Sequence, residues 1–405
     1  MGRGTNLLRL ADFNEAVVLD SVRRTPAGLS RSQLGRLSGL TPQTISNIAR
    51  RLLEKELIQE GEPIQAARGK PRIPLIIDGT GGYALGVHVD PARLTVVLLD
   101  LAGEIKGYTH LRTPNARFPK RVIELISTTA DSLVQRADVD PSRVLGLGVA
   151  APGPIDVTAG VVLDPPQLPN WRNVRLRADL HERTGFPVLL DKDVTAAATA
   201  ELRASPSRSH NFVFLYLGSG VGAGVVLADE VVRGATNNIG EVGEILVDPD
   251  ADDLGWGRRG SLAMACMPEA LVAQAARLGL FEPPAYADYG AVDDALTALC
   301  EMAHAGNQTA CALIDRSARG VATGLAVIVN LLDVDRVVLG GPMWSRVSAR
   351  YLALLPELLA AKLIAARQPI PVEGSAVGEH VAAQGAAGLV LDHFLAPRPS
   401  VLVME

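Results

Sequence analysis

The chain has 405 residues, of which 48% are hydrophobic, 44 are acidic and 39 are basic, for a net charge of −5. This length allows two or three domains with substantial cores. No apolar run approaches the ~20 residues of a membrane span, and the N-terminus lacks the apolar segment of a signal peptide. The three cysteines have no metal-type spacing. We therefore expect a reduced, cytoplasmic protein with no membrane partner.

The charge is distributed unevenly along the chain. Residues 1–78 hold 12 basic and 8 acidic side chains, a net charge of +4. The remainder holds 27 basic and 36 acidic side chains, a net charge of −9. A small basic module attached to a larger acidic body is typical of a DNA-binding domain joined to a sensor.

The first segments predict a helix-turn-helix unit. Residues 14–24 and 30–40 have the pattern of two short helices, and Gly39 permits the turn before a third helix in residues 41–58. Thr41 can cap this third helix, and Pro42 is favourable at its first position. Its apolar side is formed by Ile45, Ile48, Ala49 and Leu52. The residues expected to contact DNA are Thr41, Gln43, Thr44, Ser46, Asn47 and Arg50.

A basic loop, residues 67–74, follows this helix and resembles the wing of a winged helix. Arg68 and Lys70 flank Gly69, which allows the backbone to approach a groove wall closely. A solvated basic linker is the alternative interpretation of the loop, and an ordinary solvated surface helix is the alternative for residues 41–58. The turn, the capped helix and the basic loop together favour a double-stranded DNA operator as a partner.

The body has the pattern of two related α/β lobes. Residues 83–90, 93–100 and 104–111 predict an antiparallel meander. Further helices are expected in residues 118–136, 194–203, 262–278, 291–304, 309–332 and 380–395. Further strands are expected in residues 144–150, 188–191, 212–217, 218–228 and 336–341. We expect a winged helix in residues 1–78, a first lobe in 79–205 and a second lobe in 206–405, with the last helix packing on the first lobe.

Five segments of the body resemble a known family. They are APGPID (151–156), LLDKDVTAAATAE (189–201), LGSGVGAGVV (217–226), GATNNIGEVGEI (234–245) and VVLGGP (337–342). In this order they resemble the ROK family (repressors, open reading frames and sugar kinases), in its transcriptional-repressor branch, over residues 12–393. The resemblance implies a winged helix-turn-helix followed by a two-lobed, actin-like (ribonuclease H-like) α/β fold. It also implies a sugar cleft between the lobes and assembly as a homodimer or homotetramer.

The sequence departs from the family kinases where they hold ATP. Those kinases begin with Asp-x-Gly-Gly-Thr, and the matching residues here are Asp90, Pro91, Ala92 and Arg93. Proline removes an N–H donor, and alanine and arginine replace small or hydroxylated partners of phosphate. We therefore expect no ATP binding and no phosphoryl transfer, although an arginine here can still bind an anion.

The zinc site of the family is also changed. The histidine and three cysteines of the family correspond to Glu244, Leu254, Trp256 and Ser261. Leucine and tryptophan cannot bind zinc, so we expect no zinc at this place. We expect the packing of Trp256 and Leu254 to hold the loop instead.

The sugar site is only partly preserved. Asp193 matches the catalytic base of the family, and Glu241 matches a sugar-binding glutamate. Lys192 replaces an asparagine, Glu244 a histidine and Ala263 a second glutamate. The resemblance thus implies an effector site formed by Gly153, Lys192, Asp193, Glu241 and Glu244. Two alternatives remain open: Lys192 forms an ion pair with Asp193 or binds an acidic or phosphorylated sugar, and Asp193 caps the following helix.

Three functions are consistent with these features. The first is a sugar-responsive transcriptional regulator, a repressor of carbohydrate metabolism with a non-catalytic kinase-like body. The second is an ATP-dependent sugar kinase that carries a DNA-binding module. The third is a DNA-binding regulator that a protein partner controls. The DNA-binding module and the altered ATP segment favour the first.

Overall fold

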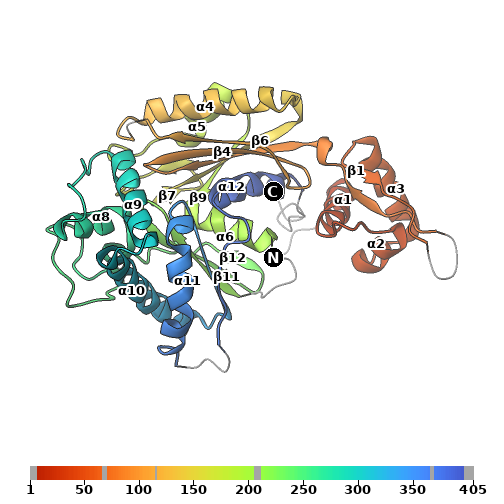
Figure 1. Cartoon of the computed structure of the whole chain (residues 1–405). Helices are drawn as coiled ribbons and strands as arrows, with labels where there is room; N and C mark the ends of the chain where they lie inside the picture. Colours follow the sequence, from red (N-terminus) through yellow and green to blue (C-terminus); the bar gives the residue numbers. More distant parts are fainter. Residues whose placement is uncertain (1–6, 66–70, 115, 205–210, 365–368, 396–405) are drawn as a thin grey trace.

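The computed structural model describes residues 7–65, 71–114, 116–204, 211–364 and 369–395. A small winged-helix module projects from one end of a two-lobed α/β body (Figure 1). The lobes contain one five-stranded sheet each, so the mixed α/β class expected from the sequence is confirmed. Within the described residues, the helices include none that is long and apolar enough to cross a membrane.

The winged helix is built from local signals in the sequence. It comprises α1 (Leu7–Arg23), α2 (Arg31–Ser38), α3 (Pro42–Glu54) and the antiparallel strands β1 (Ile58–Glu60) and β2 (Leu75–Ile77). Ser30 and Gln33 form a capping box at the start of α2, and Gly39 ends it with a φ of 70°. The predicted apolar side of α3 is confirmed, since all four of its residues are buried.

The first lobe has the strand order β5-β4-β3-β6-β9. Its strands are β3 (Tyr83–Val89), β4 (Arg93–Asp100), β5 (Ile105–Arg112), β6 (Val144–Ala151) and β9 (Val188–Lys192). The predicted meander is confirmed, and β6 and β9 then add in parallel. One face of the sheet packs on α4 (Pro119–Arg136) and α5 (Leu176–Thr184), the second of which was not predicted. A small hairpin, β7 (Ile155–Asp156) and β8 (Val161–Val162), follows β6.

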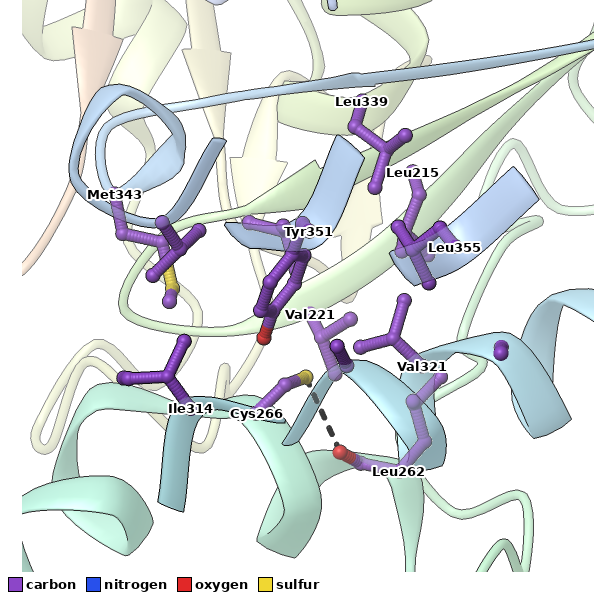
Figure 2. Close-up of a cluster of buried hydrophobic side chains, with 14 of the residues drawn as sticks. Leu215, Val221, Leu262, Cys266, Ile314, Val321, Leu339, Met343, Tyr351 and Leu355 are labelled. Atoms are coloured by element: carbon purple, nitrogen blue, oxygen red, sulfur yellow. Dashed lines mark hydrogen bonds between the residues drawn. The ribbon is translucent and has the colours of Figure 1, made fainter. Parts of the chain in front are cut away.

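The second lobe has the strand order β12-β11-β10-β13-β14. Its strands are β10 (Phe212–Leu217), β11 (Val221–Leu227), β12 (Glu230–Val232), β13 (Arg336–Gly340) and β14 (Val372–Gly374). Its helices are α7 (Leu262–Cys266), α8 (Pro268–Arg277), α9 (Tyr289–His304), α10 (Gln308–Leu332) and α11 (Trp344–Ala360). Their side chains pack on the sheet around Tyr351 (Figure 2). The Tyr351 hydroxyl lies 2.6 Å from that of Ser317.

Two predictions for this lobe were wrong. The single helix expected in residues 262–278 is divided, because Met267 has extended backbone and Pro268 starts a new helix. The helix α11 was not predicted at all, and it contains Pro356 in its interior.

Two helices, α6 (Asp193–Ala204) and α12 (Val381–Leu395), pack against each other between the two sheets (Figure 1). The close approach of α12 to its neighbours depends on glycine. A Cβ on Gly385 of α12 would lie 1.8 Å from the carbonyl oxygen of Ala196 on α6, and one on Gly148 of β6 would lie 1.9 Å from that of Ala386 on α12. The C-terminal half of α12 also shares a hydrophobic core with α1 and β2 of the winged helix. The helix α12 thus contacts both the two-lobed body and the winged helix.

Candidate functional site

The helix α3 presents a polar face to solvent. Thr41 accepts a hydrogen bond from the Thr44 amide at 3.2 Å and so caps the helix. Gln43 donates to the side chain of Asn47 at 3.4 Å, which orders two amides on the exposed face. The side chain of Arg50 is 69% exposed and has only a long contact of 4.0 Å with Glu54. These groups match the donors and acceptors on base edges and phosphates.

The wing is described only at its base. Arg68, Gly69 and Lys70 lie outside the described residues. The strands β1 and β2 and a bridge between Ile64 and Arg72 lead towards them. Arg72 is exposed at this base and adds a cation that the list of expected DNA contacts did not include.

An open cleft lies between the lobes and is lined by polar and charged side chains from both of them. Four residues expected in the effector site line it, namely Gly153, Lys192, Asp193 and Glu241. Glu244 does not line the cleft: it is exposed, and its carbonyl oxygen accepts a hydrogen bond from Arg258 at 3.1 Å. Its inclusion in the cleft was therefore wrong, because the loop turns it outward. Gln167 and Tyr216 also line the cleft and were not predicted.

Lys192 connects the two lobes across the cleft. Its ammonium group forms an ion pair with Glu241 at 2.5 Å and donates to the carbonyl oxygen of Ile239 at 3.0 Å. The side chain is only 3% exposed, so this pairing satisfies a cation that is otherwise costly to bury. Of the alternatives left open for Lys192, the ion pair is present, but its partner is Glu241 and not Asp193.

Asp193 begins α6 at the base of the cleft and accepts a hydrogen bond from the Val194 amide at 2.7 Å. The pKa of its carboxyl is raised to about 7, mainly by burial and to a smaller extent by the charges of Glu241 and Asp90, against the lowering effect of Lys192 and of the Val194 amide. The carboxyl therefore exchanges a proton near neutral pH. Such a group can accept a hydrogen bond from a sugar hydroxyl or donate one to it.

Asp193→Asn should stabilise the fold at neutral and higher pH. Because the folded pKa is raised, the native state retains this proton while the unfolded chain loses it. Ionisation therefore destabilises the folded state between about pH 4 and pH 7, and the full penalty is present above that range. Asparagine keeps the acceptor for the Val194 amide and removes the penalty. Melting temperatures of variant and parent should diverge from about pH 4 upwards, and a constant difference across this range would contradict the assignment.

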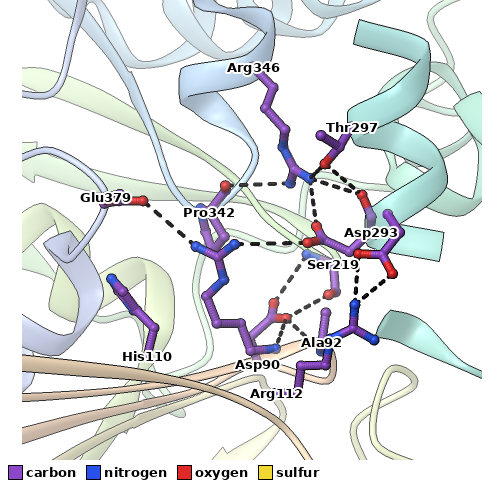
Figure 3. Close-up of polar contacts among 12 residues, drawn as sticks. Asp90, Ala92, His110, Arg112, Ser219, Asp293, Thr297, Pro342, Arg346 and Glu379 are labelled. Carbon is purple, nitrogen blue, oxygen red and sulfur yellow. Dashed lines mark hydrogen bonds and ion pairs between the residues drawn. The ribbon is translucent and has the colours of Figure 1, made fainter. Parts of the chain in front are cut away.

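Residues 90–93, which correspond to the phosphate-binding segment of the family kinases, are hydrogen-bonded within their own turn and to the glycine-rich turn of the second lobe. The carboxylate of Asp90 is 4% exposed and accepts hydrogen bonds from the Ala92 amide at 2.9 Å and from the Ser219 hydroxyl at 2.7 Å (Figure 3). Ser219 belongs to the glycine-rich turn before β11, so this contact joins the two lobes. The Asp90 carboxylate is therefore engaged by groups of both turns.

Arginine side chains extend this connection. Arg93 lies 3.9 Å from Asp293 and 3.7 Å from Glu379, and Arg346 pairs with Asp293 at 2.8 Å (Figure 3). These contacts bring together the β3–β4 turn, α9, α11 and the loop before α12. An incoming triphosphate would have to break them, and it would find carboxylates beside each arginine.

The loop that replaces the zinc segment is held partly as expected. Leu254 is 9% exposed and packs against Met264, but Trp256 is 42% exposed and the expected packing of its ring was wrong. Backbone contacts hold the loop instead, since the amides of Val247 and Asp248 donate to the Gly260 carbonyl oxygen. Arg277 adds a hydrogen bond of 2.7 Å to the Asp253 carbonyl oxygen.

Known proteins share the sequence pattern and the fold of this chain. The model of the ROK family matches residues 84–393. The chain is 24% identical to a xylose repressor of Caldicellulosiruptor bescii over 95% of this chain and 97% of that protein. A crystal structure described as a ROK family transcriptional regulator, homolog of E. coli MLC protein, superposes with a TM-score of 0.74 and 24% identity over 95% of this chain and 97% of that one. A ROK family glucokinase from Streptomyces griseus, in complex with glucose and AMPPNP, superposes with a TM-score of 0.64 and 25% identity. The superposition covers 76% of this chain and 99% of the glucokinase. The chain therefore belongs to the ROK family.

Proposed function

We propose that the chain is a sequence-specific DNA-binding transcriptional regulator of carbohydrate metabolism, acting as a repressor. The observation that carries this proposal is the exposed polar face of α3 within a winged helix, where amide and guanidinium groups project from a packed three-helix core. The xylose repressor matches this chain over 95% of its length, whereas the glucokinase covers 76% of it. Residues Thr41, Gln43, Thr44, Ser46, Asn47 and Arg50, with Arg68, Gly69 and Lys70 of the wing, form the proposed DNA-binding surface.

The body is proposed to bind a sugar or sugar phosphate in the cleft lined by Gly153, Lys192, Asp193 and Glu241. A ligand that displaces Glu241 from Lys192 would alter the contact between the lobes. Only a ligand that binds the two lobe arrangements with different affinity can shift the DNA-binding module. In a homodimer or homotetramer, the modules would bind the two halves of a palindromic operator.

ATP-dependent catalysis does not form part of the proposal. The carboxylate of Asp90 is engaged by the Ala92 amide and by Ser219, and Arg93 is paired with carboxylates. The loop around Leu254 and Trp256 likewise lacks the ligand types of a zinc site. A sugar kinase remains the second candidate because Asp193, with its pKa of about 7, is present in the cleft.

The proposal is tested by selecting genomic DNA fragments with the full chain and then titrating the recovered site with sugars and sugar phosphates. We expect one enriched palindromic sequence, steeply salt-dependent binding and a change in affinity with one member of the panel. The same panel is assayed for ADP release from ATP. Absence of any preferred sequence, or rapid ATP-dependent phosphorylation without an effect on DNA binding, would favour the kinase instead.

A further inference from the structure

A cluster of two histidines and one glutamate lies outside the DNA-binding face and the effector cleft. His110 is on β5 of the first lobe, whereas Glu379 and His380 immediately precede α12. One ligand atom of each residue lies within 4.8 Å of the others, and within the described residues no other group of three His, Cys, Asp or Glu side chains meets this condition. The imidazole rings of His110 and His380 lie against each other, with centroids 4.7 Å apart and planes tilted by 35°.

Both histidines have a nitrogen without a hydrogen-bond partner. Among the described residues, five buried side-chain polar atoms lack a partner, and two of them are Nε2 of His110 and Nδ1 of His380. A buried nitrogen without a partner is unfavourable, so two adjacent ones point to a ligand that binds both.

The surroundings orient these side chains. The Thr95 hydroxyl lies 3.1 Å from Nδ1 of His110, opposite it on the neighbouring strand β4, and thereby occupies the nitrogen that is not needed for a ligand. The loop that carries His380 is fixed by α6, since Glu201 accepts hydrogen bonds from the Ser375 hydroxyl at 2.9 Å and from the Ala376 amide at 3.1 Å. A polar group that binds the second nitrogen of a histidine is the usual second contact in metal sites.

We propose that His110, Glu379 and His380 bind a divalent transition-metal ion of the zinc type, through Nε2 of His110, Nδ1 of His380 and the carboxylate of Glu379. Imidazole and carboxylate together favour zinc, cobalt or nickel over calcium or magnesium, which prefer oxygen ligands alone. Three protein ligands leave a coordination position open to water or to a small anion. The ion would link the first lobe to the start of α12, the helix that contacts the winged helix.

Arg93 is a positive charge that opposes metal binding at this site. Its guanidinium lies 3.7 Å from Glu379, so metal and arginine compete for the same carboxylate. Arg93 also lies 3.9 Å from Asp293 and retains that partner when Glu379 turns to the metal. Figure 3 shows His110 and Glu379 on the same side of this arginine network. Removing the guanidinium should therefore strengthen metal binding, an effect that simple structural damage would not produce.

The test uses the full chain without an affinity tag, from which metal has been removed with a chelator. Zn²⁺ is then titrated into the protein in the presence of a chromophoric chelator that competes for the ion. The parent should bind one ion per chain, and Co²⁺ should give visible absorption bands. His110→Gln and His380→Gln should each weaken binding by at least about tenfold, as should Thr95→Val through the loss of its contact to His110. Arg93→Met should bind several-fold more tightly than the parent.

The matched control is His181→Gln on α5, an exposed histidine remote from the cluster, whose affinity for Zn²⁺ should equal that of the parent. Circular dichroism checks that each variant is folded. The proposal is overturned if the parent binds no stoichiometric Zn²⁺, as it would if water alone satisfies the two nitrogens. It is equally overturned if His110→Gln and His380→Gln retain the parent's affinity, which would place the ion elsewhere, such as in the loop around Trp256.

Discussion

Arg50→Ala is expected to weaken binding to the selected operator by about tenfold to a hundredfold, which corresponds to about 1–3 kcal/mol. The guanidinium projects from the exposed face of α3 and is 69% accessible. Its contact with Glu54 is long and exposed, so the substitution should barely change the melting temperature. Fluorescence anisotropy with the operator and with a scrambled duplex, measured over a range of salt concentrations, tests this.

The two possible roles of Arg50 give different results. If it contacts a base, affinity for the operator falls much more than affinity for the scrambled duplex. If it contacts a phosphate, both fall together and the salt dependence becomes shallower by about one unit of slope. Arg183→Ala, which removes an exposed arginine from α5 of the body, is the matched control and should leave both affinities unchanged. If Arg50→Ala binds the operator as tightly as the parent, the exposed face of α3 is not the DNA-binding surface.

Features encoded by local pattern were predictable from the sequence. The core side of α3 follows from apolar residues at helical spacing, and its start follows from Thr41 and Pro42. The meander of β3, β4 and β5 likewise follows from short apolar runs with tight turns. By contrast, α11 escaped prediction because Pro356 interrupts its sequence pattern, although neighbouring packing keeps the segment helical.

The candidate site was predictable only where the family resemblance supplied the contacts. Residues 192 and 193 are adjacent, yet Lys192 ends a strand and Asp193 begins a helix, so the side chain of Lys192 pairs across the cleft with Glu241. Arg93 finds its carboxylates about two hundred residues or more along the chain, at Asp293 and Glu379. Such partners depend on how the lobes meet, which no local pattern contains. The proximity of His110 to His380 was not predictable for the same reason, because these residues come from distant parts of the chain.

One ion-pair cluster connects the body to the DNA-binding module. Asp392 on α12 accepts a hydrogen bond from Arg23 of α1 at 2.7 Å and also pairs with Arg203 at the end of α6. Arg23 is 9% exposed and has a second partner in Asp20 at 2.6 Å. Burial lowers the pKa of Arg203, and the negative charge of Asp392 opposes that effect. Since α6 begins with Asp193 in the cleft, this cluster connects the helix at the cleft to the winged helix.

Asp392→Asn should loosen this connection. It leaves two arginines side by side without the carboxylate between them, at a cost of about 2 kcal/mol, less than for a fully buried pair because Asp392 is 34% exposed. Hydrogen exchange should accelerate in α1 and α12 while the sheets of the body keep their protection. In titrations with the effector, the variant should still bind operator, but the ligand should change its affinity less than it does for the parent.

A double-mutant cycle separates this effect from general destabilisation. Arg203→Met removes one of the two cations, so Asp392→Asn should cost less in that background than in the parent, with a coupling energy of about 0.5–3 kcal/mol. Asp179→Asn on α5, whose contact with Arg175 is a surface pair at 3.7 Å, should change neither exchange nor effector response. If Asp392→Asn keeps the full response of operator binding to the effector, the signal does not pass through this cluster. The shared core of α12 with α1 and β2 would then be the remaining route between the cleft and the DNA.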